Sequence, residues 1–108
     1  MLIVKDVLQH LSNQNVQYFV NNILPNYKYA LITNDYSTTM NNNADIVKGQ
    51  HRTLDLAAPP FNLTNLQVQL EYKTLGSPKR VYIYTSTNWF KSILLHNTIV
   101  CNLQQFFI

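Results

Sequence analysis

The sequence predicts a single-domain α+β protein with an N-terminal helix, a mainly antiparallel sheet of four or five strands, and a second helix after a central hairpin. Three observations lead to this class. Residues 65–87 alternate apolar and polar side chains around a turn, and residues 15–23 repeat apolar side chains with helical spacing. The 108 residues suffice for one hydrophobic core, so we expect residues 1–108 to form one domain.

The N-terminal part of the chain carries two groups of apolar residues with helical spacing. The first group is Val4, Val7, Leu8 and Leu11, and the second is Val16, Phe19, Val20 and Ile23. Ser12 separates the groups, and Pro25 ends the second because the residue before a proline disfavours helical backbone angles. The pattern predicts one broken helix or two short helices.

Two strands and a loop are predicted between these helices and the hairpin. Residues 27–33 are apolar and aromatic, which is typical of a buried strand. Residues 41–43 are three asparagines without apolar period, and they predict a loop tip that is mobile and tolerates change. Residues 46–56 predict a strand with a kink near Gly49, and residues 57–60 predict an extended connector.

The hairpin has the clearest pattern in the chain. Apolar residues occupy every second position of its first strand: Leu66, Val68, Leu70 and Tyr72. This alternation predicts a strand with one apolar and one polar face. Gly76 and Pro78 predict a turn, and residues 80–85 predict the second strand. Asn88 then caps the predicted second helix, which ends near Asn97, and residues 98–103 predict a last strand.

Composition argues against a membrane-spanning protein. The mean hydropathy is -0.13, and the longest apolar runs fall far short of the roughly 20 residues that a spanning helix needs. The N-terminus lacks the basic and apolar regions of a secretory signal, so we expect an intracellular protein. Cys101 is the only cysteine, which excludes a disulfide within the chain.

No local motif predicts a cofactor, a metal site or catalysis. The three histidines, His10, His51 and His96, lie far apart in the sequence. Gly49 and Gly76 are the only glycines, too few for a phosphate-binding loop. We therefore expect no cofactor and no metal, and a non-enzymatic role is favoured.

Positive charge is concentrated in the hairpin and the residues after it. Residues 1–65 hold four basic and four acidic side chains, whereas residues 66–108 hold only Glu71 against four cations: Lys73, Lys79, Arg80 and Lys91. Aromatic residues such as Tyr82 and Trp89 lie near these cations in the sequence, and single-stranded nucleic-acid binders combine such residues. Nucleic-acid binding is therefore one alternative. A solvated turn with its aromatic residues in the core accounts for the same pattern.

A second alternative comes from Asp55 and the run Glu71-Tyr72-Lys73. This pattern resembles the D…ExK motif of the PD-(D/E)xK nuclease family. The resemblance implies that Asp55 and Glu71 hold a divalent cation that activates water and that Lys73 stabilises phosphate charge. The chain departs from the family because a turn follows Lys73 and no proline precedes Asp55. Alternatively, Glu71 and Lys73 simply belong to the polar face of an amphipathic strand.

An assembly or protein-interaction role is the function that the sequence favours. Phe106, Phe107 and Ile108 place three large apolar side chains together. They must be folded into the core or covered by a protein partner or a second copy of the chain. Fourteen Asn and eight Gln are typical of an AT-rich genome. With the small size, this composition favours a phage or viral structural accessory protein that is incorporated into a virus particle.

Overall fold

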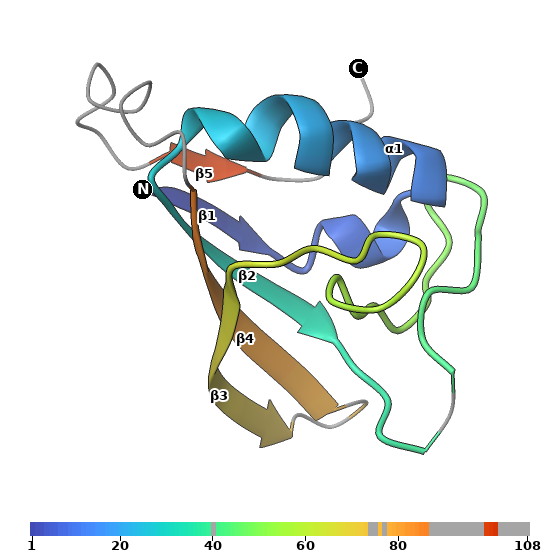
Figure 1. Ribbon diagram of the computed structural model, residues 1–108. Coiled ribbons are helices and arrows are strands. Elements are labelled where there is room, and N and C mark those ends of the chain that lie inside the picture. The colour runs from blue at the N-terminus through green and yellow to red at the C-terminus, as the bar shows by residue number, and fades with distance from the viewer. Residues whose placement is uncertain (40, 74–75, 77, 87–98, 102–108) are drawn as a thin grey trace.

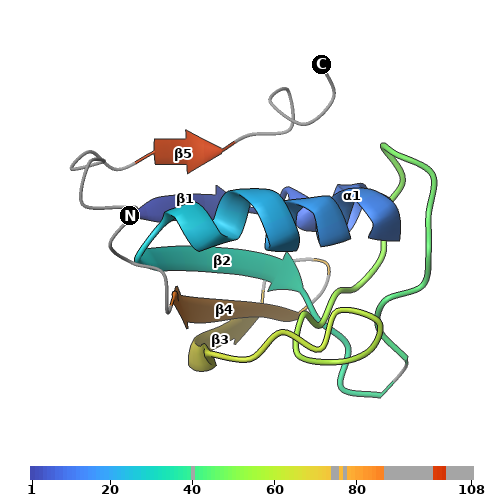
Figure 2. The same cartoon turned by 45° about the horizontal axis from the view of Figure 1, so that its top comes forward.

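The computed structural model describes residues 1–39, 41–73, 76, 78–86 and 99–101, which form one five-stranded sheet with a helical segment on one face (Figures 1 and 2). The strands are β1 (Leu2–Lys5), β2 (Tyr29–Asp35), β3 (Leu66–Lys73), β4 (Pro78–Thr85) and β5 (Ile99–Cys101). Their order across the sheet is β3-β4-β2-β1-β5. The α+β class is therefore confirmed.

The sheet is mixed, whereas the sequence predicted a mainly antiparallel one. β1 runs parallel to both β2 and β5, and β4 runs antiparallel to both β2 and β3. The difference arises because the helical segment between β1 and β2 carries the chain back to the end of the sheet at which β1 begins. The next strand then begins on the same side as β1 and runs parallel to it.

The predicted N-terminal helix is not matched, because the chain begins with a strand. Leu2–Lys5 is β1, and Leu8–His10 is a single 3-10 turn, η1. Val4, Val7, Leu8 and Leu11 are all buried, so a strand end followed by a tight turn places them in the core together. Their spacing resembled that of a helix, although the backbone changes conformation within the group.

A longer helical segment starts at Asn13. It comprises α1 (Asn13–Tyr18), a π-helical segment η2 (Phe19–Ile23) and a 3-10 turn η3 (Leu24–Asn26). The Ser12 side chain caps α1 by accepting a hydrogen bond from the Asn15 amide at 3.3 Å. The segment buries one stripe of apolar side chains against the sheet: Val16, Phe19, Val20 and Leu24. The strand–helix–strand unit from β1 to β2 is thereby held on a single core.

The core also receives side chains from the long loop between β2 and β3. Leu54, Leu56 and Phe61 join the apolar residues of the helical segment and the strands in one cluster. The predicted strand over residues 46–56 is wrong, because no strand forms there. Leu54 and Leu56 are buried while Asp55 between them is partly exposed, so a loop that lies along the core reproduces the alternation of a strand.

Asn43 anchors this loop, although residues 41–43 were predicted as a loop tip. Its side chain is buried. The side-chain oxygen accepts a hydrogen bond from the Asp55 amide at 2.7 Å, and the side-chain nitrogen donates hydrogen bonds to the carbonyls of Asp55 and Pro59 at 2.8 Å. Its positive φ of 70° is a conformation that asparagine tolerates better than most residues. The segment is a loop, but the Asn43 side chain holds it to residues 55 and 59 by hydrogen bonds.

The hairpin of β3 and β4 and the strand β2 are confirmed, and β5 lies within the predicted last strand. A bulge between Val68 and Leu70 changes the register of β3. Val68 lies opposite Tyr82, whereas Leu70 lies opposite Val81, and opposed residues share a face of the sheet. The predicted single apolar face is therefore wrong: Val68 and Leu70 lie on opposite faces, and both are exposed.

Two further predictions fall on residues that the structure does not describe. The helix that follows the hairpin and the apolar residues 106–108 both lie outside the described ranges. In the part of the chain that is described, no helix is long and apolar enough to cross a membrane.

Candidate functional site

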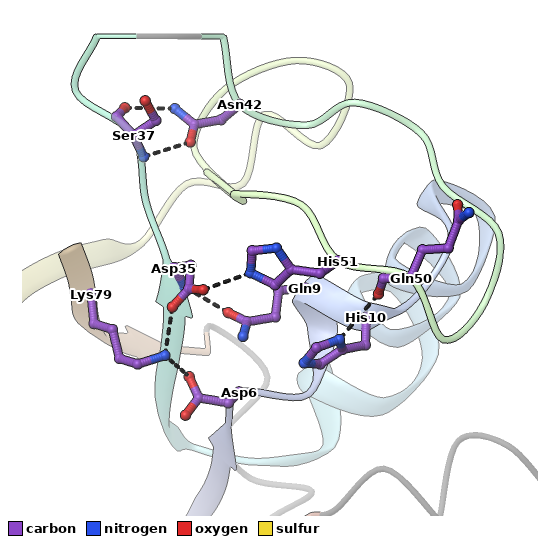
Figure 3. Close-up of polar contacts among 9 residues, drawn as sticks. All are labelled: Asp6, Gln9, His10, Asp35, Ser37, Asn42, Gln50, His51 and Lys79. Carbon is purple, nitrogen blue, oxygen red and sulfur yellow. Dashed lines mark hydrogen bonds and ion pairs between the residues drawn. The ribbon is translucent and has the colours of Figure 1, made fainter. Parts of the chain in front are cut away.

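A cluster of polar side chains lies where the parallel strands β1 and β2 end (Figure 3). Its members come from the end of β1, turn η1, the end of β2, the long loop and β4: Asp6, Gln9, Asp35, His51 and Lys79. The carboxyl ends of parallel strands are the usual position of ligand sites in α/β sheets. We refer to these five residues as the strand-end cluster.

Asp35 is the centre of the strand-end cluster. Its Oδ1 accepts a hydrogen bond from the Lys79 ammonium group, and its Oδ2 is 2.6 Å from Nε2 of His51. The Asp35 amide donates to Oε1 of Gln9 at 2.6 Å. Lys79 also contacts Oδ1 of Asp6 at 2.9 Å. Both carboxylate oxygens of Asp35 thus have fixed partners (Figure 3).

Asp35 and Lys79 each stabilise the charged form of the other. Burial by itself would raise the pKa of Asp35, but the hydrogen bonds from Lys79 and His51 and the positive charge of Lys79 outweigh burial and lower it. Burial would likewise lower the pKa of Lys79, but its bonds to Asp35 and Asp6 raise it. Asp35 is therefore an anion and Lys79 a cation at neutral pH.

The ionised Asp35 fixes the orientation and tautomer of His51. A carboxylate only accepts hydrogen bonds, so the neutral His51 ring carries its hydrogen on Nε2 and leaves a lone pair on Nδ1. The second ring nitrogen points away from Asp35 (Figure 3), and the His51 side chain is 44% exposed. His51 therefore presents a hydrogen-bond and proton acceptor at the protein surface.

A cavity of about 350 Å³ adjoins His51. Besides the His51 and Tyr36 rings, its walls carry four hydroxyl groups and one amide, from Ser37, Thr38, Thr39, Thr53 and Asn41. Two hydrogen bonds fix the backbone of Ser37 in one wall. The Asn42 side chain accepts a hydrogen bond from the Ser37 amide at 2.9 Å and donates one to the Ser37 carbonyl at 3.0 Å (Figure 3). The cavity combines a half-exposed histidine with groups that both donate and accept hydrogen bonds.

His10 lies beside this site without lining the cavity. Its ring centroid is 5.6 Å from that of His51, and its Nδ1 is paired with the Gln50 carbonyl at 3.0 Å. Sequence distance suggested that these two histidines are unrelated, but the loop brings them together. Among the described residues, no group of three or more His, Cys, Asp or Glu side chains is arranged so that it could hold a metal ion.

The cations of the predicted nucleic-acid surface differ in their surroundings. Lys79 is bound to two carboxylates of the same chain. Arg80 pairs with Glu71, with an Nη2–Oε1 distance of 2.6 Å, and its guanidinium lies 3.4 Å from the centroid of the Tyr36 ring. Lys73 is exposed at the end of β3, and Lys91 lies outside the described residues. Of the three cations that the structure describes, two thus have intramolecular partners.

The residues that resemble the nuclease motif also have other partners. Glu71 binds Arg80, and Asp55 accepts a hydrogen bond from the Tyr82 hydroxyl at 3.3 Å. Nη1 of Arg80 donates a hydrogen bond to the Tyr82 hydroxyl oxygen at 3.4 Å, so a chain of contacts links Asp55 to Glu71. A guanidinium group, rather than open space between two carboxylates, lies next to Glu71.

The strand-end cluster itself could not be located from the sequence. Its residues are spread from position 6 to position 79 and share no spacing. One signal was present: Asp6 follows β1 directly, and Asp35 is the last residue of β2. Aspartates at the ends of two parallel strands meet at one edge of a sheet, but this is predictable only where β1 is recognised as a strand.

Comparison with protein-family models, with curated proteins and with solved structures finds no match to this chain.

Proposed function

We propose that the protein binds a small polar molecule in the cavity beside His51, and that His51 accepts a hydrogen bond or a proton from this molecule. The observation that carries the proposal is the position of the His51–Asp35 pair. It lies at the carboxyl ends of parallel strands and adjoins a cavity. A histidine held by a carboxylate is a common proton acceptor in binding and catalytic sites.

A purely structural role would account for only part of the cluster. Lys79 is mostly buried between Asp6 and Asp35, as expected of an ion pair that stabilises the fold. His51 differs because it is almost half exposed and one of its nitrogens points away from the ion pair (Figure 3). An exposed ion pair with a histidine adds little stability, so the orientation of His51 is better explained by binding.

A fragment screen by NMR spectroscopy tests the proposal. We expect small polar fragments to shift the amide signals of Tyr36 and Thr53, which line the cavity. His51→Ala should abolish these shifts because it removes the acceptor. His10→Ala is the matched control, since His10 is a neighbouring histidine that does not line the cavity, and it should retain them. Shifts that are absent, or that are equal in the two variants, would contradict the proposal.

We also propose an assembly role, as the apolar residues 106–108 suggested. The supporting observation is the edge strand β3, where Val68 and Leu70 are 46% and 56% exposed on opposite faces. Exposed apolar residues on an edge strand favour association with another chain. Light scattering over a range of concentrations, alone and with cell extract, tests it: a chain that stays monomeric and unpartnered throughout would exclude this role.

A further inference from the structure

We infer that the ligand of the cavity beside His51 is an uncharged, hydroxyl-bearing molecule of about the size of one sugar. This inference rests on the proposed binding function and adds the chemical class of the ligand. It follows from four properties of the site: the pairing of nearby charges, the composition of the wall, the acceptor on His51, and the volume of the cavity.

The charges near the cavity are already paired within the chain. Lys79 is bound by Asp6 and Asp35, and Arg80 is bound by Glu71. The two oxygens of Asp35 are taken by Lys79 and His51. Neither a phosphate nor an ammonium group on a ligand would therefore find an unpaired counter-charge among these residues, and placing a charge in a cavity without a partner is costly.

The described residues of the wall carry no permanent charge. Hydroxyl groups of Ser37, Thr38, Thr39 and Thr53 can each donate and accept a hydrogen bond, and the Asn41 amide can do both. Such groups match alcohols, which also donate and accept. They offer no such advantage to a ligand that carries only apolar groups.

His51 requires a donor on the ligand. Because Asp35 holds the hydrogen of Nε2, the free Nδ1 has only a lone pair to offer. A ligand hydroxyl can donate to it, whereas an ether or a carbonyl oxygen cannot. The ligand must therefore carry at least one hydroxyl or comparable N–H or O–H group.

The cavity limits the size of the ligand. Its volume of about 350 Å³ is at the lower end of the range for small-molecule sites, which is roughly 300 to 1,000 Å³. The Tyr36 ring provides an apolar wall, and Arg80 holds this ring in place from a distance of 3.4 Å. One hydroxylated ring, such as a monosaccharide, fits these dimensions and this combination of surfaces.

Ligands that share a scaffold and differ in charge test the inference. We would titrate the isotope-labelled full chain with glucose, glucose 6-phosphate and glucosamine, which are neutral, anionic and cationic at neutral pH. A second pair, ribose and ribose 5-phosphate, repeats the comparison on another ring. The neutral member of each set should bind with a Kd about tenfold lower than its charged counterparts, because only the charged ones lose hydration without gaining a counter-charge.

Two variants connect the binding to the cavity. Thr53→Val keeps the shape of the side chain, removes its hydroxyl, and should weaken binding of the neutral ligand by about 2- to 10-fold. His10→Ala should leave the Kd of the neutral ligand unchanged, because His10 does not line the cavity.

The outcomes separate this inference from the proposed function. Tighter binding of the phosphate or the amine would overturn the inference, and so would fragments that bind at the cavity while both neutral ligands fail. If no fragment and no titrated ligand binds there, the proposed function itself fails, and the inference fails with it.

Discussion

Replacing Phe19 with alanine should lower the free energy of unfolding by about 3 to 5 kcal/mol. Phe19 is fully buried where α1 continues into η2, and it belongs to the cluster that joins the helical segment, the sheet and the long loop. Its removal leaves a cavity between all three. A loss of this size is a large part of the roughly 5 to 15 kcal/mol that stabilises a typical domain.

The neighbouring Tyr18 provides the control for this experiment. Its side chain is 61% exposed, so Tyr18→Ala removes an aromatic ring from the same helical segment without opening the core. Its effect should stay within about 0.5 kcal/mol, as for most surface substitutions. Urea unfolding of the two variants, followed by circular dichroism, measures the difference. Equal losses would show that the segment does not pack on the sheet through Phe19.

Replacing Lys79 with methionine should destabilise the protein by roughly 3 kcal/mol at neutral pH. The Lys79 side chain is only 13% exposed and lies between Asp6 and Asp35. Methionine keeps most of the side-chain volume but leaves two carboxylates close together without their cation. Lys73→Met is the control, because Lys73 is exposed on the same hairpin, and we expect it to change stability by less than about 0.5 kcal/mol.

The same substitution should change the response of the protein to acid. The pKa of Asp35 is lower in the folded protein than its ordinary value. Its contribution to stability is therefore present above that ordinary value, near pH 4, and is lost as the pH falls through the lowered value. Lys79→Met removes one cause of the lowering, so the difference between wild type and variant should shrink below about pH 4. A difference that stays constant down to acid pH would contradict the ion-pair assignment.

The elements that the sequence predicted well are those whose evidence is local. Alternating side chains and turn residues are visible within the hairpin itself, and β2 begins with the apolar run of residues 29–32. β1 has only four residues; β2 and β5 pair with its backbone, and its Leu2 and Val4 side chains are buried in the core. Its burial depends on partners that are distant in the sequence, so a local pattern could not distinguish it from the turn that follows.

The candidate site was beyond local reasoning for a related reason. His51 belongs to a loop that the sequence predicted as a strand, and it reaches Asp35 because Leu54 and Leu56 hold that loop on the core. Lys79 was predicted to lie in a basic turn, either binding nucleic acid or solvated, but β4 pairs with β2 and places it opposite Asp35. Both positions result from tertiary contacts, which a single sequence does not display.

Asp35 holds His51 so that Nδ1 of the His51 ring stays available to a ligand. Long-range ¹H–¹⁵N spectra of the imidazole rings, recorded in neutral to mildly alkaline buffer, report which ring nitrogen carries the hydrogen. We predict that His51 is a single tautomer with the hydrogen on Nε2 and a lone pair on Nδ1, and that Asp35→Ala converts it to a mixture. A hydrogen on Nδ1 in the wild-type protein, or a mixture of tautomers that Asp35→Ala leaves unchanged, would contradict the claim.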